Sequence, residues 1–196
     1  MHELFTKDQN KKIKEFISLA LEFNKTHNIF VRKNHEEVFQ KDVLDCAPLI
    51  NMIGVGESVI DLGSGGGFPG VLLSICLPNN PISLLEGSSK KCYFLKTLVE
   101  KLSLKNTKTI NQKIKENNNL GAYDVITARA FASTKKIITL TKNNTHKNTK
   151  HILLKGKKKT VQEELSLIDK NQYICEIINK DTKEYERNIV IIKKNE

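Results

Sequence analysis

The feature that most constrains this chain of 196 residues is an apolar segment at residues 59–62 that runs directly into the glycine-rich sequence GSGGGFPG at residues 63–70. Glycine adopts positive φ angles without strain and has no Cβ atom, so the chain can turn tightly here and approach a ligand closely. Residues 68–77 predict a helix, whose N-terminus would face that ligand. The pattern predicts a strand, a turn and a helix that close around an adenosine cofactor.

Strands and helices alternate along the rest of the chain. Strands are predicted at residues 58–62, 82–86, 107–111, 123–128 and 151–155, and helices at 68–77, from Ser88 onwards, at 134–142 and at 159–168. This alternation is typical of βαβ units and therefore of a parallel sheet. Two further strands, at 172–179 and 187–193, are expected to form an antiparallel hairpin at the sheet edge. We thus expect an α/β, Rossmann-like fold with a mostly parallel seven-stranded sheet, in which residues 142–149 form a solvated loop.

The first 50 residues predict a small helical cap. Thr6 and Gln9 have the spacing of a capping box, and five apolar residues then recur at helical spacing: Ile13, Phe16, Ile17, Ala20 and Leu21. A second short helix is predicted from His35 to Ala47, ending before Pro48. Residues 1–50 are therefore interpreted as the cap, and residues 51–196 as one compact α/β domain.

Composition narrows the class of protein. Hydrophobic residues make up 39% and charged residues 28% of the chain, which is typical of a soluble globular protein, and no apolar run is long enough to span a membrane. Because the N-terminus lacks the apolar stretch of a secretory signal, we expect a cytoplasmic protein with no membrane partner. Neither the four scattered cysteines nor the five histidines have metal-binding spacing, so no metal and no disulfide framework is expected.

The charge balance points to an anionic partner. The chain has 32 Lys and Arg against 22 Asp and Glu, a formal net charge of +10. Such an excess favours nucleic acid as the partner. A genome biased towards lysine and asparagine codons would produce a similar excess, and charge alone does not separate the two interpretations.

The glycine run is compatible with two cofactors. Residues 65–70 satisfy the dinucleotide pattern G-x-G-x-x-G, which keeps an NAD-dependent oxidoreductase as an alternative. However, Asp61 lies on the predicted strand just before Gly63 and suits a ligand with an ammonium group, and Pro69 removes an N–H where a pyrophosphate would need donors. Glu86, at the end of the next strand, can accept both hydroxyls of a ribose. Together these residues favour S-adenosylmethionine; a non-catalytic basic RNA-binding module is the third hypothesis.

Three residues outside the run are candidates for positioning a substrate. Arg129, at the end of a predicted strand, could bind a cofactor carboxylate, an RNA phosphate or guanine O6, because its planar fork suits each. Lys155, at the end of the following strand, could face a phosphate or a base, or simply lie on the surface. Asn28 is either a hydrogen-bonding group near the ligand or a capping residue. Phe68, in the glycine run, is the aromatic residue expected beside the ligand.

Several segments, in order along nearly the whole chain, resemble one family. Residues 24–29 (NKTHNI) resemble N-K-x-x-N-L, and residues 61–70 resemble D-x-G-[ST]-G-x-G-[FL]-P-G. Residues 84–95 are similar to L-L-[DE]-S-x-x-K-R-x-x-F-L. Residues 124–132 and 153–156 resemble D-x-[VI]-x-x-R-A-x-A and A-L-K-G. The chain thus resembles the RsmG (GidB) family of ribosomal RNA methyltransferases, and the F-P-G and R-A-x-A parts are the most specific.

The resemblance implies a class I methyltransferase fold and a monomer that transfers methyl from S-adenosylmethionine to N7 of a guanine in the 530 loop (position 527) of 16S ribosomal RNA. The substrate would be that RNA or a precursor of the small ribosomal subunit. Substrate positioning falls to Arg129, Lys155 and Asn28. The resemblance implies Gly63, Phe68, Ile114, Lys115 and Arg129 as cofactor-binding residues, with Glu86 at the ribose. With Asp61 and the glycine run added, the predicted cofactor site comprises Asp61, Gly63, Ser64, Gly65, Gly67, Phe68, Glu86, Ile114, Lys115 and Arg129.

Two segments depart from the family pattern. Residues 113–116 read KIKE where the family has R-x-E-E, which leaves Lys115 with an expected backbone contact to the adenine. Residues 41–46 read KDVLDC where the family has R-H-x-L-D-S, so Asp42 stands in place of the histidine. Guanine N7 carries a lone pair and no proton, so the transfer requires alignment of the reacting atoms and no general base.

Overall fold

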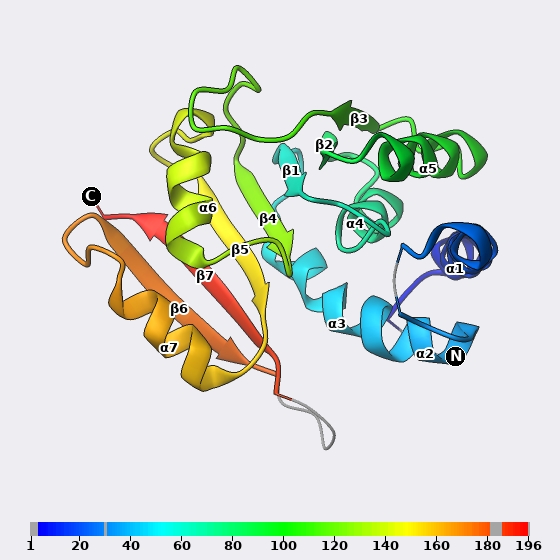
Figure 1. The fold of residues 1–196 in the computed structure, drawn as a ribbon, viewed down its shortest axis with the longest axis horizontal. Coiled ribbons are helices and arrows are strands. Elements are labelled where there is room, and N and C mark those ends of the chain that lie inside the picture. The colour runs from blue at the N-terminus through cyan, green and yellow to red at the C-terminus, as the bar shows by residue number, and fades with distance from the viewer. Residues whose placement is uncertain (1–3, 30, 181–185, 196) are drawn as a thin grey trace.

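The computed structural model describes residues 4–29, 31–180 and 186–195. Its centre is a seven-stranded sheet in the order β3-β2-β1-β4-β5-β7-β6 (Figure 1). The strands are β1 (Val59–Leu62), β2 (Ile82–Glu86), β3 (Thr107–Asn111), β4 (Val125–Arg129), β5 (Lys150–Lys155), β6 (Tyr173–Asn179) and β7 (Asn188–Lys194). The first five are parallel, whereas β7 pairs antiparallel with both β5 and β6. The predicted parallel sheet and terminal hairpin are confirmed.

Helices cover both faces of the sheet (Figure 1). α1 (Lys7–His27), α4 (Gly70–Cys76) and α5 (Ser89–Lys101) lie on one face, and α6 (Thr134–Leu140) and α7 (Lys158–Ser166) on the other. β1 shows why two layers form: Val59 belongs to the apolar cluster under α4, whereas Ile60 and Leu62 belong to the cluster under α6 and α7. Alternate residues of a strand point to opposite faces, so one short strand supplies both cores.

The N-terminal cap folds largely as predicted. Thr6 and Gln9 form the capping box of α1, and the apolar side of this helix packs into the same cluster as α4 and α5. The second helix ends at Cys46, before Pro48 as predicted, but an unpredicted 3₁₀ segment follows it directly. The helical path continues from α2 (His35–Val38) through η1 (Phe39–Val43), α3 (Leu44–Cys46) and η2 (Ala47–Met52). Pro48 lies in the first turn of the 3₁₀ segment η2, where a missing N–H costs no hydrogen bond.

The polar stretch at 142–149 is only partly solvated, contrary to the prediction. It contains the short 3₁₀ segment η3 (Lys142–Asn144), and Asn144 is 1% exposed. Its side-chain amide donates to Asn118 Oδ1 and to the Gly121 carbonyl, both at 2.8 Å. This buried amide ties the stretch to the long loop before β4, an arrangement that polar composition alone does not reveal.

No described helix is long and apolar enough to cross a membrane. Within the same residues, no group of three or more His, Cys, Asp or Glu side chains is arranged to hold a metal ion.

Candidate functional site

The glycine run lies at the carboxyl end of β1, next to the carboxyl end of β4. The strand order reverses between these two strands, which is where open α/β sheets bind their ligands. Gly63 and Gly65 have φ angles of +68° and +49°, and the amides of Gly63 and Ser64 both donate to the Leu85 carbonyl of β2. A Cβ atom on Gly63 would lie 2.6 Å from the Phe131 ring, so this position requires glycine.

A cavity of about 800 Å³ opens above this loop. Its walls come from the glycine loop, from the residues after β4 and β5, from the start of α7 and from the helical cap. Six of the residues predicted for the site line it: Gly63, Ser64, Gly65, Phe68, Arg129 and Lys155. The size fits a ligand of nucleoside dimensions.

Asp61 lies beneath the loop and holds its two ends together. Its side chain is buried, and Oδ2 accepts a hydrogen bond of 3.1 Å from the Gly70 amide at the start of α4. The other oxygen, Oδ1, is buried and has no hydrogen-bond partner among the described residues. Burial raises the pKa of Asp61 to about 6. An unpartnered carboxylate oxygen is the kind of acceptor that a ligand ammonium group requires.

Glu86 supports the loop from β2. One carboxylate oxygen accepts from the Gly65 amide at 2.9 Å, and the other accepts from the Ser88 amide at 2.8 Å. Each oxygen keeps a further lone pair, so the carboxylate can still accept hydroxyl protons from a ribose. The side chain therefore orders the loop and retains the chemistry predicted for it.

Phe68 and Arg129 are in direct contact at the wall of the cavity. The Arg129 guanidinium lies 5.4 Å from the centroid of the Phe68 ring, and that ring packs against Phe16 of α1 at 4.7 Å. This geometry is a cation–π contact. It places the charged end of β4 directly beside the glycine loop.

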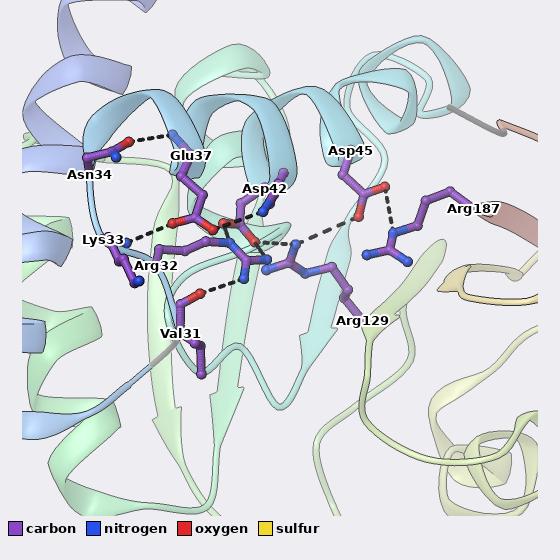
Figure 2. Close-up of polar contacts among 10 residues, drawn as sticks. Val31, Arg32, Lys33, Asn34, Glu37, Asp42, Asp45, Arg129 and Arg187 are labelled. Carbon is purple, nitrogen blue, oxygen red and sulfur yellow. Dashed lines mark hydrogen bonds and ion pairs between the residues drawn. The ribbon is translucent and has the colours of Figure 1, made fainter. Parts of the chain in front are cut away.

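Arg129 belongs to a row of five charged residues, and the ion pairs within this row were not predicted from the sequence. The row alternates in sign, in the order Arg32, Asp42, Arg129, Asp45 and Arg187 (Figure 2). Arg32 and Arg129 each donate to Asp42 at 2.7 Å. Burial acts to lower the pKa of Arg129, but the neighbouring Cys46, Asp42 and Asp45 outweigh it and the pKa is raised. The guanidinium is therefore charged at any working pH.

Lys155, at the end of the neighbouring strand β5, also lines the cavity and is paired with an acid. Its Nζ donates to Glu164 Oε2 and to the Ala132 carbonyl, both at 2.8 Å. The same Glu164 oxygen accepts from the amide and hydroxyl of Thr134. Lys155 therefore fastens the segment after β4 to α7, and its charge is largely balanced before any substrate arrives.

The structure does not bring every predicted residue into the cavity. Asn28 is exposed and forms the C-cap of α1, with φ +47° and its amide donating to the Asn24 carbonyl. Gly67 packs under the loop against Phe16. Ile114 is buried in the core beneath α6 and α7, and Lys115 is exposed in the loop before β4. Ligand contacts by these residues, and by Asp61 and Glu86 beneath the loop, stay predictions.

The site residues fit S-adenosylmethionine. The Oδ1 atom of Asp61 is an unsatisfied acceptor suited to the amino group of the methionine portion. Glu86 suits the ribose, and the glycine loop lets the backbone approach the ligand. The charged guanidinium of Arg129 suits a carboxylate or a phosphate.

Comparison with known families and sequences gives one consistent result. The family model GidB, described as rRNA small subunit methyltransferase G, matches residues 9–191. A relative from Brachyspira hyodysenteriae, named ribosomal RNA small subunit methyltransferase G, is 37% identical over 192 residues and covers 94% of this chain and 92% of its own length. A relative of the same name from Francisella philomiragia is 30% identical, with 96% and 90% covered.

Solved structures share the fold at low sequence identity. An O-methyltransferase from Bacillus cereus in complex with SAH has a TM-score of 0.65 at 13% identity, covering 92% of this chain and 91% of that one. A precorrin-6y C5,15-methyltransferase from Geobacter metallireducens has a TM-score of 0.59 at 15% identity, with 78% and 86% covered. The expected fold, that of class I methyltransferases, is thereby confirmed.

Proposed function

The chain belongs to the GidB family, rRNA small subunit methyltransferase G, and from this premise we propose that it transfers a methyl group from S-adenosylmethionine to N7 of a guanine in the 530 loop of 16S ribosomal RNA. The observation that carries the proposal is the unpartnered Asp61 oxygen beneath a glycine loop at the sheet's reversal point. It supports a cofactor with an ammonium group in a chain of this family. We propose that the enzyme acts as a cytoplasmic monomer.

In the proposed cofactor site, different structural elements bind different parts of the ligand. Asp61 would hold the amino group, Glu86 the ribose, and the backbone of Gly63 and Gly65 would lie against the nucleoside. When bound, S-adenosylmethionine supplies an electrophilic methyl group on a sulfonium. Since both supporting carboxylates are already fixed by backbone amides, little reorganisation is needed on binding.

The side chains around the cavity suit a reaction that needs no general base. Guanine N7 attacks with its own lone pair, so no proton has to be removed. Accordingly, no histidine and no cysteine lines the cavity among the described residues, and its acidic residues are paired with Arg or Lys. The contribution of the protein is to align N7 with the methyl group, which can account for a large share of the rate enhancement.

The test is methyl transfer from radiolabelled S-adenosylmethionine to small-subunit RNA from cells that lack this protein, offered naked and protein-bound. The modified position is mapped by cleavage at N7-methylguanine. One labelled guanine in the 530 loop is expected. Label at another nucleotide would keep the methyltransferase and overturn the substrate assignment. Preference for NAD in a binding titration would favour an oxidoreductase, and binding of neither cofactor would favour an RNA-binding module.

A further inference from the structure

The placement of arginine in this chain is highly uneven. Arg32, Arg129 and Arg187 are its three arginines, and all three line the same cavity; every other residue among its 32 Lys and Arg is a lysine. A lysine offers a compact charge, whereas an arginine offers a planar fork that binds two phosphate oxygens at once. A ligand that required only positive charge could be bound by lysines. The selection of arginine here indicates a ligand that requires the fork.

The acidic side chains of the row are more deeply buried than its basic side chains. The side chains of Asp42 and Asp45 are 4% and 5% exposed, whereas those of Arg32, Arg129 and Arg187 are 22%, 23% and 34% exposed. The carboxylates are therefore the buried members of the row. Figure 2 shows Asp42 between Arg32 and Arg129. The guanidinium groups remain accessible from the cavity.

Arg32 and Arg129 both retain donors after their internal bonds are formed. Arg32 donates from Nε and Nη2 to Asp42, at 2.7 and 3.1 Å, and from Nη1 to the Val31 carbonyl. That uses three of its five N–H groups. Arg129 donates to Asp42 through Nη1 alone among the described residues, with Asp45 further away at 3.8 Å. Each fork is therefore oriented by Asp42 and keeps N–H groups for a ligand.

We propose that Arg32 and Arg129, held in place by Asp42, bind a backbone phosphate of the RNA beside the guanine that enters the cavity. The inference rests on the proposed function and names the substrate contact of that same site. Arg32 is a binding residue, and Asp42 is a positioning residue because it acts through the two arginines. The family pattern has a histidine at this position, and an imidazole carries no negative charge with which to hold two guanidinium groups, so this clamp depends on the aspartate of this chain.

The carboxylate of the cofactor could bind the same two arginines, because its chemistry is similar to that of a phosphate. Separate measurements of RNA binding and of cofactor binding distinguish these two ligands. We would measure equilibrium binding of Arg32→Gln and Arg32→Lys to unmethylated small-subunit RNA over a series of KCl concentrations. Binding of S-adenosylmethionine alone is measured in parallel. The matched control is Lys150→Gln: the Lys150 side chain is 18% exposed and paired with Glu57 at 2.9 Å, but it lies at the amino end of β5, whereas the cavity lies at the carboxyl ends of the strands.

For Arg32→Gln we expect RNA affinity to fall about tenfold to a hundredfold, the loss typical of hydrogen bonds to a charged group. The slope of log affinity against log salt should become shallower by about 0.7 to 0.9, equivalent to one phosphate contact. Arg32→Lys should recover the slope but only part of the affinity. Cofactor affinity should stay within about twofold of wild type, and the control should match wild type in both measurements.

The role of Asp42 is tested by Asp42→Asn and Asp42→Glu, each checked by thermal melting. The asparagine should raise KM for RNA with a smaller change in kcat, and the glutamate should restore part of the loss because it retains the charge. If Asp42→Asn does not fold, the comparison of Arg32→Gln with Arg32→Lys still tests the phosphate clamp.

An unchanged salt slope in Arg32→Gln, or an equal loss of cofactor affinity, would overturn the phosphate clamp. If wild type methylates no small-subunit RNA, the proposed function fails instead.

Discussion

Asp61 and Gly70, nine residues apart, are joined by a buried hydrogen bond of 3.1 Å that closes the glycine loop at its base. The strand residue thereby fixes the first turn of α4, and the loop between them is held open towards the cavity. The second carboxylate oxygen has no partner among the described residues, and it is the atom to which the ammonium group of the proposed cofactor would bind.

Gly70→Ala should destabilise the protein by about 1–3 kcal/mol, because overpacking a filled core strains its neighbours. The added Cβ would lie 2.3 Å from Leu84 Cδ2 and 2.6 Å from Asp61 Oδ2. Urea unfolding would measure the loss. Gly156→Ala is the matched control, since its Cβ would meet nothing within 4 Å, and its stability should stay within about 1 kcal/mol of wild type. Equal effects of the two variants would contradict the packing argument.

The stability contributed by Asp61 should fall as the pH rises. Burial raises its pKa from 3.8 to about 6 in the folded chain, so between these values the folded state holds more protons than the unfolded state. The cost above pH 6 amounts to at most about 3 kcal/mol. Asp61→Asn should therefore gain stability relative to wild type between about pH 4 and pH 7. A stability difference independent of pH, measured by urea unfolding, would refute this assignment.

His151 should produce a pH dependence of the opposite sign. It is buried, its Nε2 lies 3.0 Å from Thr141 Oγ1, and burial, with a contribution from Lys194, lowers its pKa from 6.5 to about 4. The unfolded chain takes up a proton below pH 6.5 and the folded chain does not, so stability is lost as the pH falls through this window. Replacing His151 with Gln should remove that loss, so the stability of this variant relative to wild type should increase as the pH falls. For Asp61→Asn, the stability relative to wild type should instead increase as the pH rises. Parallel curves would rule out one of the two shifts.

Glu164→Gln should loosen the segment after β4 and reduce methyl transfer. One oxygen of Glu164 accepts from Lys155 and twice from Thr134, and these bonds lower the pKa of the carboxyl even though burial acts to raise it. We expect a loss of about 2 kcal/mol, since donors at the cavity wall lose a charged acceptor. The exposed neighbour in α7 supplies the control, Glu163→Gln, which should behave as wild type in melting and transfer assays. A similar loss in both variants would point to a general effect of charge on α7.

Parts of the fold were predictable where the cause is local. Ser88 was expected to begin a helix, and it is the N-cap of α5, accepting a hydrogen bond from the Lys91 amide. The strand at residues 107–111 was predicted from the alternation of strands and helices, and it forms a regular parallel ladder with β2. The 3₁₀ segment η2 was not predicted, because a proline such as Pro48 can also occupy the first turn of a further helical segment. The burial of Asn144 was not predicted either, because burial of a polar side chain depends on distant partners.

By itself, the sequence determined the order of the strands and helices, the glycine loop and the acidic residues at the ends of β1 and β2. These depend on periodicity and on backbone freedom, which are properties of neighbouring residues. Only the tertiary structure decided that Asp42 binds both Arg32 and Arg129, residues 10 and 87 positions away, and that Lys155 is already paired with Glu164. Such pairs form because the strand order of the sheet and the position of the cap bring remote segments to one cavity. Contacts between residues so far apart in the sequence cannot be predicted from local sequence patterns.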